Sequence, residues 1–202
     1  GFMKGSLIII CFFILGSCCG YFQLLPAFVT QSNLSYYALC ALMFSVGISI
    51  GNNPQTLRNF RSLNPRLIFL PVMTILGTLA GSAVVSFLLP HRSLTDCLAV
   101  GSGFGYYSLS SIFITEYKGA ELGTVALLAN ISREIVTLLA APLLVRWFGN
   151  LAPISAGGAT TMDTTLPIIT QTAGQQFVIV SIFHGFVVDF SVPFLVTLFC
   201  SL

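Results

Sequence analysis

Charged residues are scarce in this sequence, at 7% of 202 residues, against roughly 25% in ordinary soluble domains. Hydrophobic residues make up 55%, and the mean hydropathy is +0.94. This scarcity excludes a soluble globular protein and predicts a polytopic membrane protein. At about 20 residues per crossing, the length allows about six spanning segments. The net charge of +2 is small and scattered, which excludes a nucleic-acid surface.

Ligand motifs for metals and redox centres are also missing. The six cysteines lie in or beside apolar runs, and none forms a CxxC pair or a cluster with either histidine. We interpret them as small apolar packing residues. The sequence therefore predicts no metal and no cofactor.

The first apolar runs predict two spanning helices. Residues 1–2 precede a methionine and look like a tag scar, which leaves the run 7–21 as the first helix. A signal peptide is the alternative interpretation of that run. The second run covers residues 36–50. We treat residues 1–202 as a single transmembrane domain in contact with membrane lipid.

Positive charge is concentrated in the connector after the second run. Arg58, Arg61 and Arg66 occur there without an acidic residue, and such connectors lie on the cytoplasmic side. The connector is therefore predicted to be cytoplasmic. A clear third crossing follows it, from Arg66 to Leu89.

Two later segments are too rich in glycine and hydroxyl side chains for plain lipid-facing helices. They cover residues 96–115 and 157–167. Irregular backbone at membrane depth persists only where protein or a hydrated cavity satisfies its polar groups. The predicted fold class is therefore all-α, polytopic, with about six spanning segments including two broken or re-entrant helices. Whether the first segment crosses or returns stays open.

A membrane-length helix over residues 122–147 carries polar groups near its midpoint. Asn130, Arg133 and Glu134 recur there at three- and four-residue spacing, which places them on one face. A charge at the centre of a spanning helix costs about 2.5 to 3.5 kcal/mol. This face is therefore predicted to meet a partner or a water-filled cavity inside the protein.

The last predicted helix, residues 176–200, repeats this arrangement. Glu134 and Asp189 each come fifteen residues after a glycine that closes an interrupted segment, Gly119 and Gly174 respectively. This register predicts a weak internal duplication. The two units would be inverted if the first segment returns, and parallel if it crosses.

Several multi-residue blocks then occur in one order along the chain. They are Val46-Gly47-Ile48 with Asn52-Asn53, Gly101 to Ser110, Asn130 with Arg133-Glu134, Gly158 to Asp163 with Thr165-Leu166-Pro167, and His184-Gly185-Phe186. These blocks resemble the LysO-type lysine exporter family, most strongly over residues 39–202. The resemblance implies export of L-lysine through the bacterial inner membrane, with functional acids that fall here on Glu134 and Asp163.

The resemblance also implies additional spanning helices before the matched region. We expect a homodimer, or a separate small N-terminal membrane subunit, to supply them. A non-transporting or incomplete subunit is accordingly an alternative function. An intramembrane hydrolase with Asp163 and Asp189 as a dyad is a remote alternative, because the glycine-aspartate motif expected around one acid is missing.

The suggested mechanism is proton antiport. Moving a cation out of a negative interior costs about 2.3 kcal/mol per charge per 100 mV, so export needs coupling. A carboxylate that is partly removed from water can hold a proton until the substrate ammonium displaces it. The candidate substrate- and proton-binding residues are Asp163, Glu134, Arg133, Asn130, Asp189, His184, Gly103, Gly105, Tyr106, Ser108 and Thr161.

Several of these candidates have structural interpretations as well. Glu134 and Asp163 could be purely structural, and Tyr106 could anchor the chain at the membrane interface. Arg133 could hold the substrate carboxylate, or form a buried ion pair with Asp189. His184 could relay protons, or be a satisfied core histidine.

Overall fold

The computed structural model describes residues 3–34 and 64–202, together with Tyr37, Ala38, Ala41, Phe44, Ile48 and Asn52. The chain divides into two units, residues 1–48 and 49–202, and each is described by itself. All regular elements among the described residues are helical, which confirms the all-α class. Most of the predicted second run 36–50, with Arg58 and Arg61, lies outside the described residues.

The first unit contains α1 (Met3–Tyr21) and the short α2 (Ala27–Gln31). The helix α1 includes the predicted first spanning run, residues 7–21. Phe12 and Leu15 on α1 are 70% and 60% exposed, as suits a helix that faces lipid.

Three helices of the second unit are long and apolar enough to cross a membrane. They are Pro65–Leu88, which joins the 3-10 turn η2 to α5 (Phe69–Leu88), α8 (Ala120–Phe148), and Gln175–Ser201, which joins η4 to α11 (Val178–Ser201). They agree with three of the predicted spans, 66–89, 122–147 and 176–200, within one or two residues at each end.

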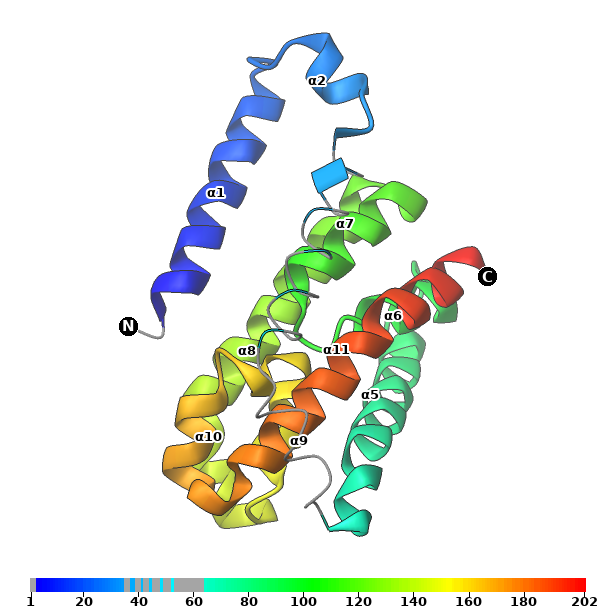
Figure 1. Cartoon of the computed structure of the whole chain (residues 1–202). Helices are drawn as coiled ribbons and strands as arrows, with labels where there is room; N and C mark the ends of the chain where they lie inside the picture. Colours follow the sequence, from blue (N-terminus) through cyan, green and yellow to red (C-terminus); the bar gives the residue numbers. More distant parts are fainter. Residues whose placement is uncertain are drawn as a thin grey trace. The chain divides into compact units, whose positions relative to one another are not determined.

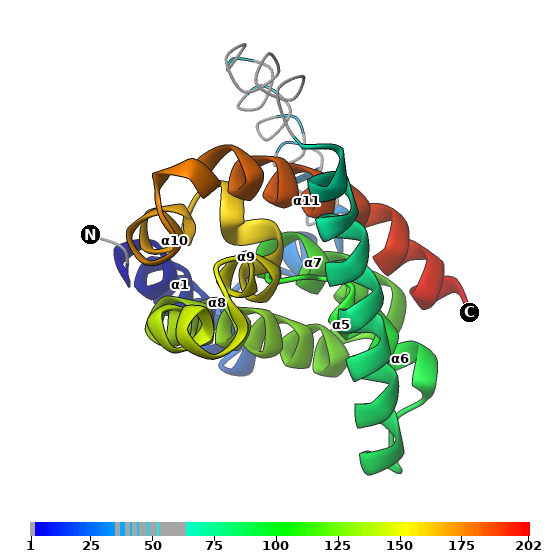
Figure 2. The same cartoon turned by 90° about the horizontal axis from the view of Figure 1, so that it is seen from below.

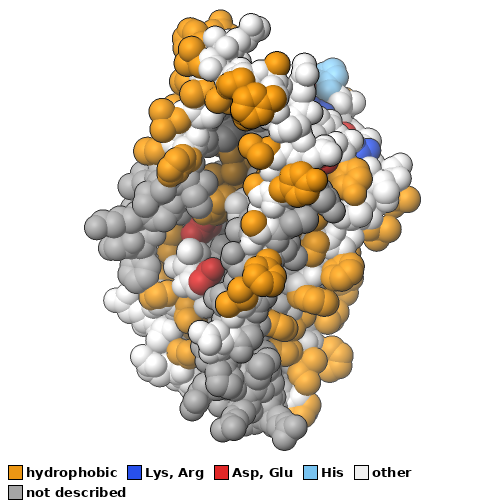
Figure 3. Space-filling view, turned by 45° about the horizontal axis from the view of Figure 1, so that its top comes forward, with side chains coloured by type: hydrophobic (Ala, Val, Ile, Leu, Met, Phe, Trp, Pro, Cys, Tyr) orange, Lys and Arg blue, Asp and Glu red, His pale blue; other side chains and the backbone are white. Residues whose placement is uncertain are grey.

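Large hydrophobic side chains point outward along all three helices. Phe87 on α5, Leu139 on α8 and Phe190 on α11 are 85%, 72% and 65% exposed. Hydrophobic side chains also cover much of the face drawn in Figure 3, where charged ones are few. An outer surface of this kind is suited to the hydrocarbon interior of a bilayer.

The first interrupted segment forms a helical hairpin, here called hairpin 1. It consists of α6 (Leu94–Gly101), a break over residues 102–106, and α7 (Tyr107–Lys118). Ser93 begins α6, because its hydroxyl oxygen accepts a hydrogen bond from the Asp96 N–H at 3.1 Å. The break contains two residues with positive φ, Phe104 at 47° and Gly105 at 87°.

Both arms of hairpin 1 start and finish at the same end of the unit. Asp96, at the start of α6, lies 3.8 Å from the ammonium of Lys118 at the end of α7. At this end Arg92, which follows α5, pairs with Glu121 in the first turn of α8. The segment therefore returns instead of crossing, which answers the question that the sequence left open.

The second interrupted segment forms hairpin 2. It consists of α9 (Ala152–Gly157), the 3-10 turn η3 (Gly158–Met162), a break over residues 163–165, and α10 (Leu166–Ala173).

Hairpin 2 also returns to the end from which it started. Ile154 on α9 packs in one buried cluster with Ile169 and Ala173 on α10 and Val180 on α11. Leu67, at the start of the Pro65–Leu88 helix, packs against the same cluster. Because that helix begins at one end and reaches Arg92 at the other, the two hairpins enter from opposite ends.

Each hairpin and the long helix after it therefore form one of two inverted units. Gly119 and Gly174, which separate hairpin from helix, have φ values of 98° and 115°. Their N–H groups donate to the carbonyl oxygens of Thr115 and Thr170 at 3.0 and 3.1 Å, so they end α7 and α10 in the same way. Figure 1 shows α7 and α10 toward opposite ends of α8, and Figure 2 shows hairpin 2 between α8 and α11.

Candidate functional site at the hairpin tips

The tips of the two hairpins touch through their backbones. The Ala159 N–H donates to the Phe104 carbonyl oxygen at 2.9 Å. Gly158, with φ of 61°, lies so close that a Cβ there would collide with the same carbonyl oxygen. A Cβ on Gly105 would lie 3.4 Å from the Gly157 carbonyl oxygen. Two irregular segments from opposite ends thus satisfy each other at mid-depth, as buried broken helices must.

Asn130 on α8 fixes the tip of hairpin 1. Its Oδ1 accepts from the Gly105 N–H at 2.8 Å, and its Nδ2 donates to the Ser110 hydroxyl at 3.1 Å and to the Ala126 carbonyl at 2.8 Å. Gly103 packs against the same amide, because a Cβ there would overlap it. The structure thus brings three predicted site residues together, with Asn130 holding the backbone in place.

Arg133 ties hairpin 2 to the long helices. Its Nε and Nη2 donate to the carbonyl oxygens of Ala156 and Ser155 at 2.8 and 3.0 Å, and its Nη1 donates to the Thr78 hydroxyl at 3.2 Å. Those carbonyls belong to the last residues of α9, where a cation complements unpaired acceptors. The guanidinium also lies 5.9 Å from the ring centroid of Phe104, within reach of a cation–π interaction.

The alternative of a buried Arg133–Asp189 ion pair is therefore wrong. Among the described residues, the ion pairs all lie at the end that holds Arg92, and none joins these two side chains. The physical reason is that Arg133 finds backbone acceptors in a broken helix. A pattern of charged residues in the sequence does not reveal such acceptors.

Helix α11 holds the tip of hairpin 2. The Ser181 hydroxyl donates to the Thr161 carbonyl at 2.6 Å. One turn further along α11, a Cβ on Gly185 would lie 2.6 Å from the Met162 nitrogen. The small residues on this face of α11 therefore let it approach the backbone of η3 closely.

His184 is fully buried and uses both ring nitrogens. Its Nδ1 lies 3.0 Å from the Thr161 hydroxyl, and its Nε2 lies 2.7 Å from the Thr74 hydroxyl. Thr74 continues the chain to the Ser155 hydroxyl at 2.8 Å. This is the arrangement of a satisfied core histidine, and it joins α5, α9, α11 and η3 in one network.

Carboxylates gather beside the tips. Asp163 lies exposed at the break of hairpin 2, where its Oδ1 accepts from the Thr164 N–H at 2.6 Å. Asp189, near the middle of α11, is 7% exposed and close enough to Asp163 for an electrostatic interaction. Tyr106, at the end of the hairpin 1 break, interacts electrostatically with both acids. Both hairpins and α11 therefore contribute to one acidic site.

Two further predicted site residues, Glu134 and Ser108, lie outside this acidic site. Glu134 is 1% exposed and sits one helical turn beyond Asn130 on α8, close enough to Tyr107 for an electrostatic interaction. Ser108 lies half-buried in the first turn of α7.

Comparison with known proteins identifies the family. The family described as "Lysine exporter LysO" matches residues 10–200. The chain belongs to the LysO lysine exporter family. It is 37% identical to "Lysine exporter LysO" of Escherichia coli strain K12 over 167 residues, which are 83% of this chain and 55% of that protein. The chain thus spans about half the length of that relative.

A second relative is matched over more of its own length. The chain is 36% identical to "Putative lysine exporter" of Haemophilus influenzae over 174 residues, 86% of this chain and 87% of that protein. No solved structure matches. The family is one of transporters, not of enzymes, and both relatives are bacterial proteins.

Several residues that build this site were not predicted as site residues from the sequence. Phe104 carries the backbone oxygen on which the tips meet, and Ser110, Thr74 and Ser155 supply hydroxyl partners. Single hydroxyl residues in apolar helices give no pattern, and they often bond to their own helix. Their role becomes visible only from the groups that they contact in the folded structure.

Proposed function

We propose that the chain exports L-lysine, or a closely related basic amino acid, across the bacterial inner membrane in exchange for protons. The observation that carries the proposal is the meeting of two oppositely directed hairpins beside Asp163 and Asp189. Secondary transporters build their sites at the bilayer midplane from interrupted helices of inverted repeats. The names of the relatives add lysine as the substrate.

The residues at the tips suit an ammonium group and a proton in alternation. Asp163 is exposed at the break and Asp189 lies nearby within α11, so the two carboxylates can share one cation. A proton on this pair would have to leave before an ammonium binds, which couples the two flows in opposite directions. Glu134, buried on α8, supplies a second proton position.

The proposed orientation follows from positive charge. Arg58, Arg61 and Arg66 precede α5 in the sequence. Arg146 lies in the last turn of α8, at the end where hairpin 2 opens, whereas the other end carries only Arg92 and Lys118 among the described arginines and lysines of the second unit. Cytoplasmic ends carry the excess of arginine and lysine. Hairpin 2 would therefore open to the cytoplasm, hairpin 1 to the outside, and α11 would end outside.

Lysine counterflow into proteoliposomes that contain only this chain tests the function. An acidic lumen should increase the uptake of labelled lysine several-fold, because protons leaving the vesicle exchange for lysine entering it. Collapsing the gradient with a protonophore should return uptake to the basal exchange rate.

Two results would count against parts of the proposal. Lysine exchange that ignores the gradient would contradict proton coupling. A chain that is inert alone, but active together with a second membrane protein, would support the alternative of a subunit that requires a partner. That alternative is motivated by the match to only 55% of the E. coli protein.

A further inference from the structure

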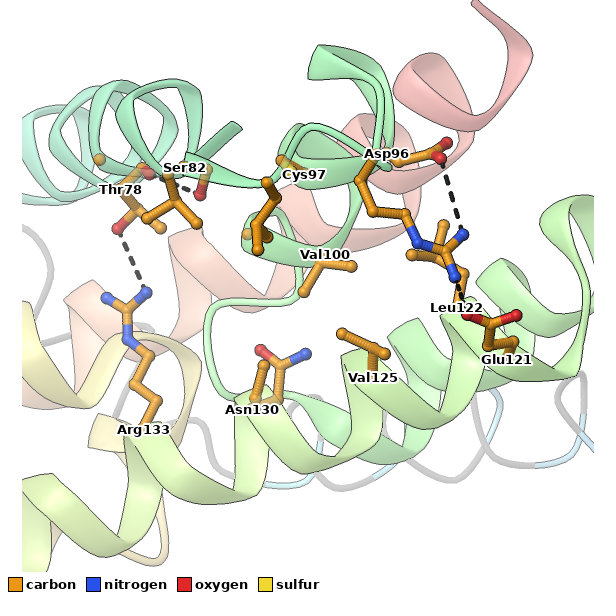
Figure 4. A pocket seen from close by; sticks show the side chains of 16 residues that line it. Thr78, Ser82, Asp96, Cys97, Val100, Glu121, Leu122, Val125, Asn130 and Arg133 are labelled. Carbon is orange, nitrogen blue, oxygen red and sulfur yellow. Dashed lines mark hydrogen bonds and ion pairs between the residues drawn. The ribbon is translucent and has the colours of Figure 1, made fainter. Parts of the chain in front are cut away.

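A groove of about 810 Å³ runs between α5, α6 and α8 on the second unit. Figure 4 shows its two polar ends, with Asp96 and Glu121 at one and Asn130 and Arg133 at the other. Arg92 also lines the groove and pairs with Glu121. Between these ends the walls are mainly apolar. Sites for small molecules commonly have volumes of ~300 to 1,000 Å³ and a few placed polar groups.

The inner end of the groove is too polar to face lipid. Arg133 lines it near the middle of α8, and Asn130 lies beside it. A charged side chain at this depth normally faces protein or water instead of hydrocarbon. The wall on α5 also carries hydroxyls, Thr78 and Ser82, next to Gly81. Water is therefore the expected filling of the groove.

Arg133 retains capacity to bind an anion in this groove. A guanidinium has five N–H donors, and its bonds to Ala156, Ser155 and Thr78 use three of them. One N–H on each of the two terminal nitrogens remains, and Arg133 lines the inner end of the groove. Arginine N–H groups form strong, charge-assisted hydrogen bonds with carboxylates.

The mouth of the groove carries acidic side chains and is therefore suited to cations. Glu121 has an 85% exposed side chain, and it pairs there with Arg92. Asp96 lies within 4.0 Å of both Arg92 and Lys118. The two carboxylates thus already hold cationic side chains, which an arriving ammonium group could replace.

We propose that this groove is the outward path of the exported amino acid, an inference that rests on the proposed function. The α-carboxylate binds the two remaining N–H groups of Arg133, and Asp96 and Glu121 then attract the cationic end toward the mouth. Glu121 and Arg133 are twelve residues apart on α8, or about 18 Å, which is longer than extended lysine. The substrate therefore moves along the groove instead of bridging its ends.

Two positions on α8 provide a matched test. Val125 lines the groove and is 46% exposed, whereas Leu128 is 53% exposed and does not line it. V125C and L128C are made in a background in which all six native cysteines are replaced. Right-side-out membrane vesicles are treated with a cationic, membrane-impermeant methanethiosulfonate. V125C should be modified and lose lysine counterflow, and L128C should resist.

Excess lysine should slow the modification of V125C at least severalfold, whereas glutamate should not. A variant that keeps Cys97 alone provides a second reporter, because this native cysteine also lines the groove. It replaces V125C if that variant fails to fold.

The outcomes separate this inference from the proposed function. If the two groove positions, V125C and Cys97, react only with a lipid-soluble maleimide, the groove holds lipid or is covered, and the proposed path is wrong. Modification that lysine does not slow would likewise overturn it. In either case, counterflow by the unmodified variants would leave lysine transport standing. A V125C that reacts, while neither it nor its cysteine-free parent shows lysine counterflow before modification, would instead refute the proposed function and, with it, the substrate assigned to the groove.

Discussion

Replacing Asp163 with asparagine should lower lysine counterflow at least tenfold and remove its response to a pH gradient. A substrate ammonium bound at Asp163 would remove the carboxylate from water. Removing one partner of such a desolvated charge pair costs about 2 to 5 kcal/mol, which corresponds to at least ~30-fold in affinity. Asparagine keeps an oxygen that can accept from the Thr164 N–H, the bond that Asp163 makes in the structure. The local fold should therefore survive, and the loss should come from the missing charge and proton.

Glu116→Gln is the matched control, because it makes the same chemical change on an exposed residue near the end of α7. Its counterflow should equal that of the wild type. Counterflow of radiolabelled lysine, with and without an acidic lumen, measures both variants. Wild-type activity and wild-type gradient response in Asp163→Asn would remove Asp163 from the mechanism.

Gly158→Ala should be the most damaging single-methyl substitution in the second unit. The position has φ of 61° and ψ of −125°, a region costing about 1 to 3 kcal/mol for other residues. The added Cβ would also collide with the Phe104 carbonyl oxygen, and overpacking of this kind costs a further ~1 to 3 kcal/mol. Because that oxygen accepts from Ala159, the contact between the tips would open.

Gly149→Ala separates the cost of the backbone conformation from the cost of the steric collision. Gly149 also has a positive φ, at 93°, but a Cβ there would meet nothing within 4 Å. Melting of the two purified variants in detergent should show a clearly larger fall in Tm for Gly158→Ala, with counterflow lost only in that variant. Equal effects would mean that contact between the tips contributes nothing beyond backbone conformation.

Composition and spacing predicted much of this architecture. The glycine- and hydroxyl-rich segments are the two hairpins, because such residues favour turns and leave polar backbone that must be buried together. The register of Gly119 and Gly174 was also informative, since each ends a helix with positive φ. The polar face of α8 correctly placed Asn130 and Arg133 toward the protein interior.

The direction of hairpin 1 could not be predicted in the same way. Its return depends on ion pairs between residues far apart in sequence, such as Arg92 with Glu121, and either topology would place these charges at a membrane surface. The hydrogen-bond partners of Arg133 could not be predicted from the sequence either. They are the backbone oxygens of Ser155 and Ala156, and every residue type carries a backbone oxygen.

The direction in which the hairpins enter the membrane is the central claim, and labelling from each side tests it most directly. Glu116 and Gln171 are both exposed, and each lies three residues before the glycine that ends its hairpin. Single cysteines at these positions, in a cysteine-free background, are treated with an impermeant maleimide in right-side-out and in inverted vesicles. The account predicts that E116C reacts only in right-side-out vesicles and Q171C only in inverted ones. Reaction of both from the same side would contradict the inverted arrangement and, with it, the meeting of two oppositely directed hairpins at the site.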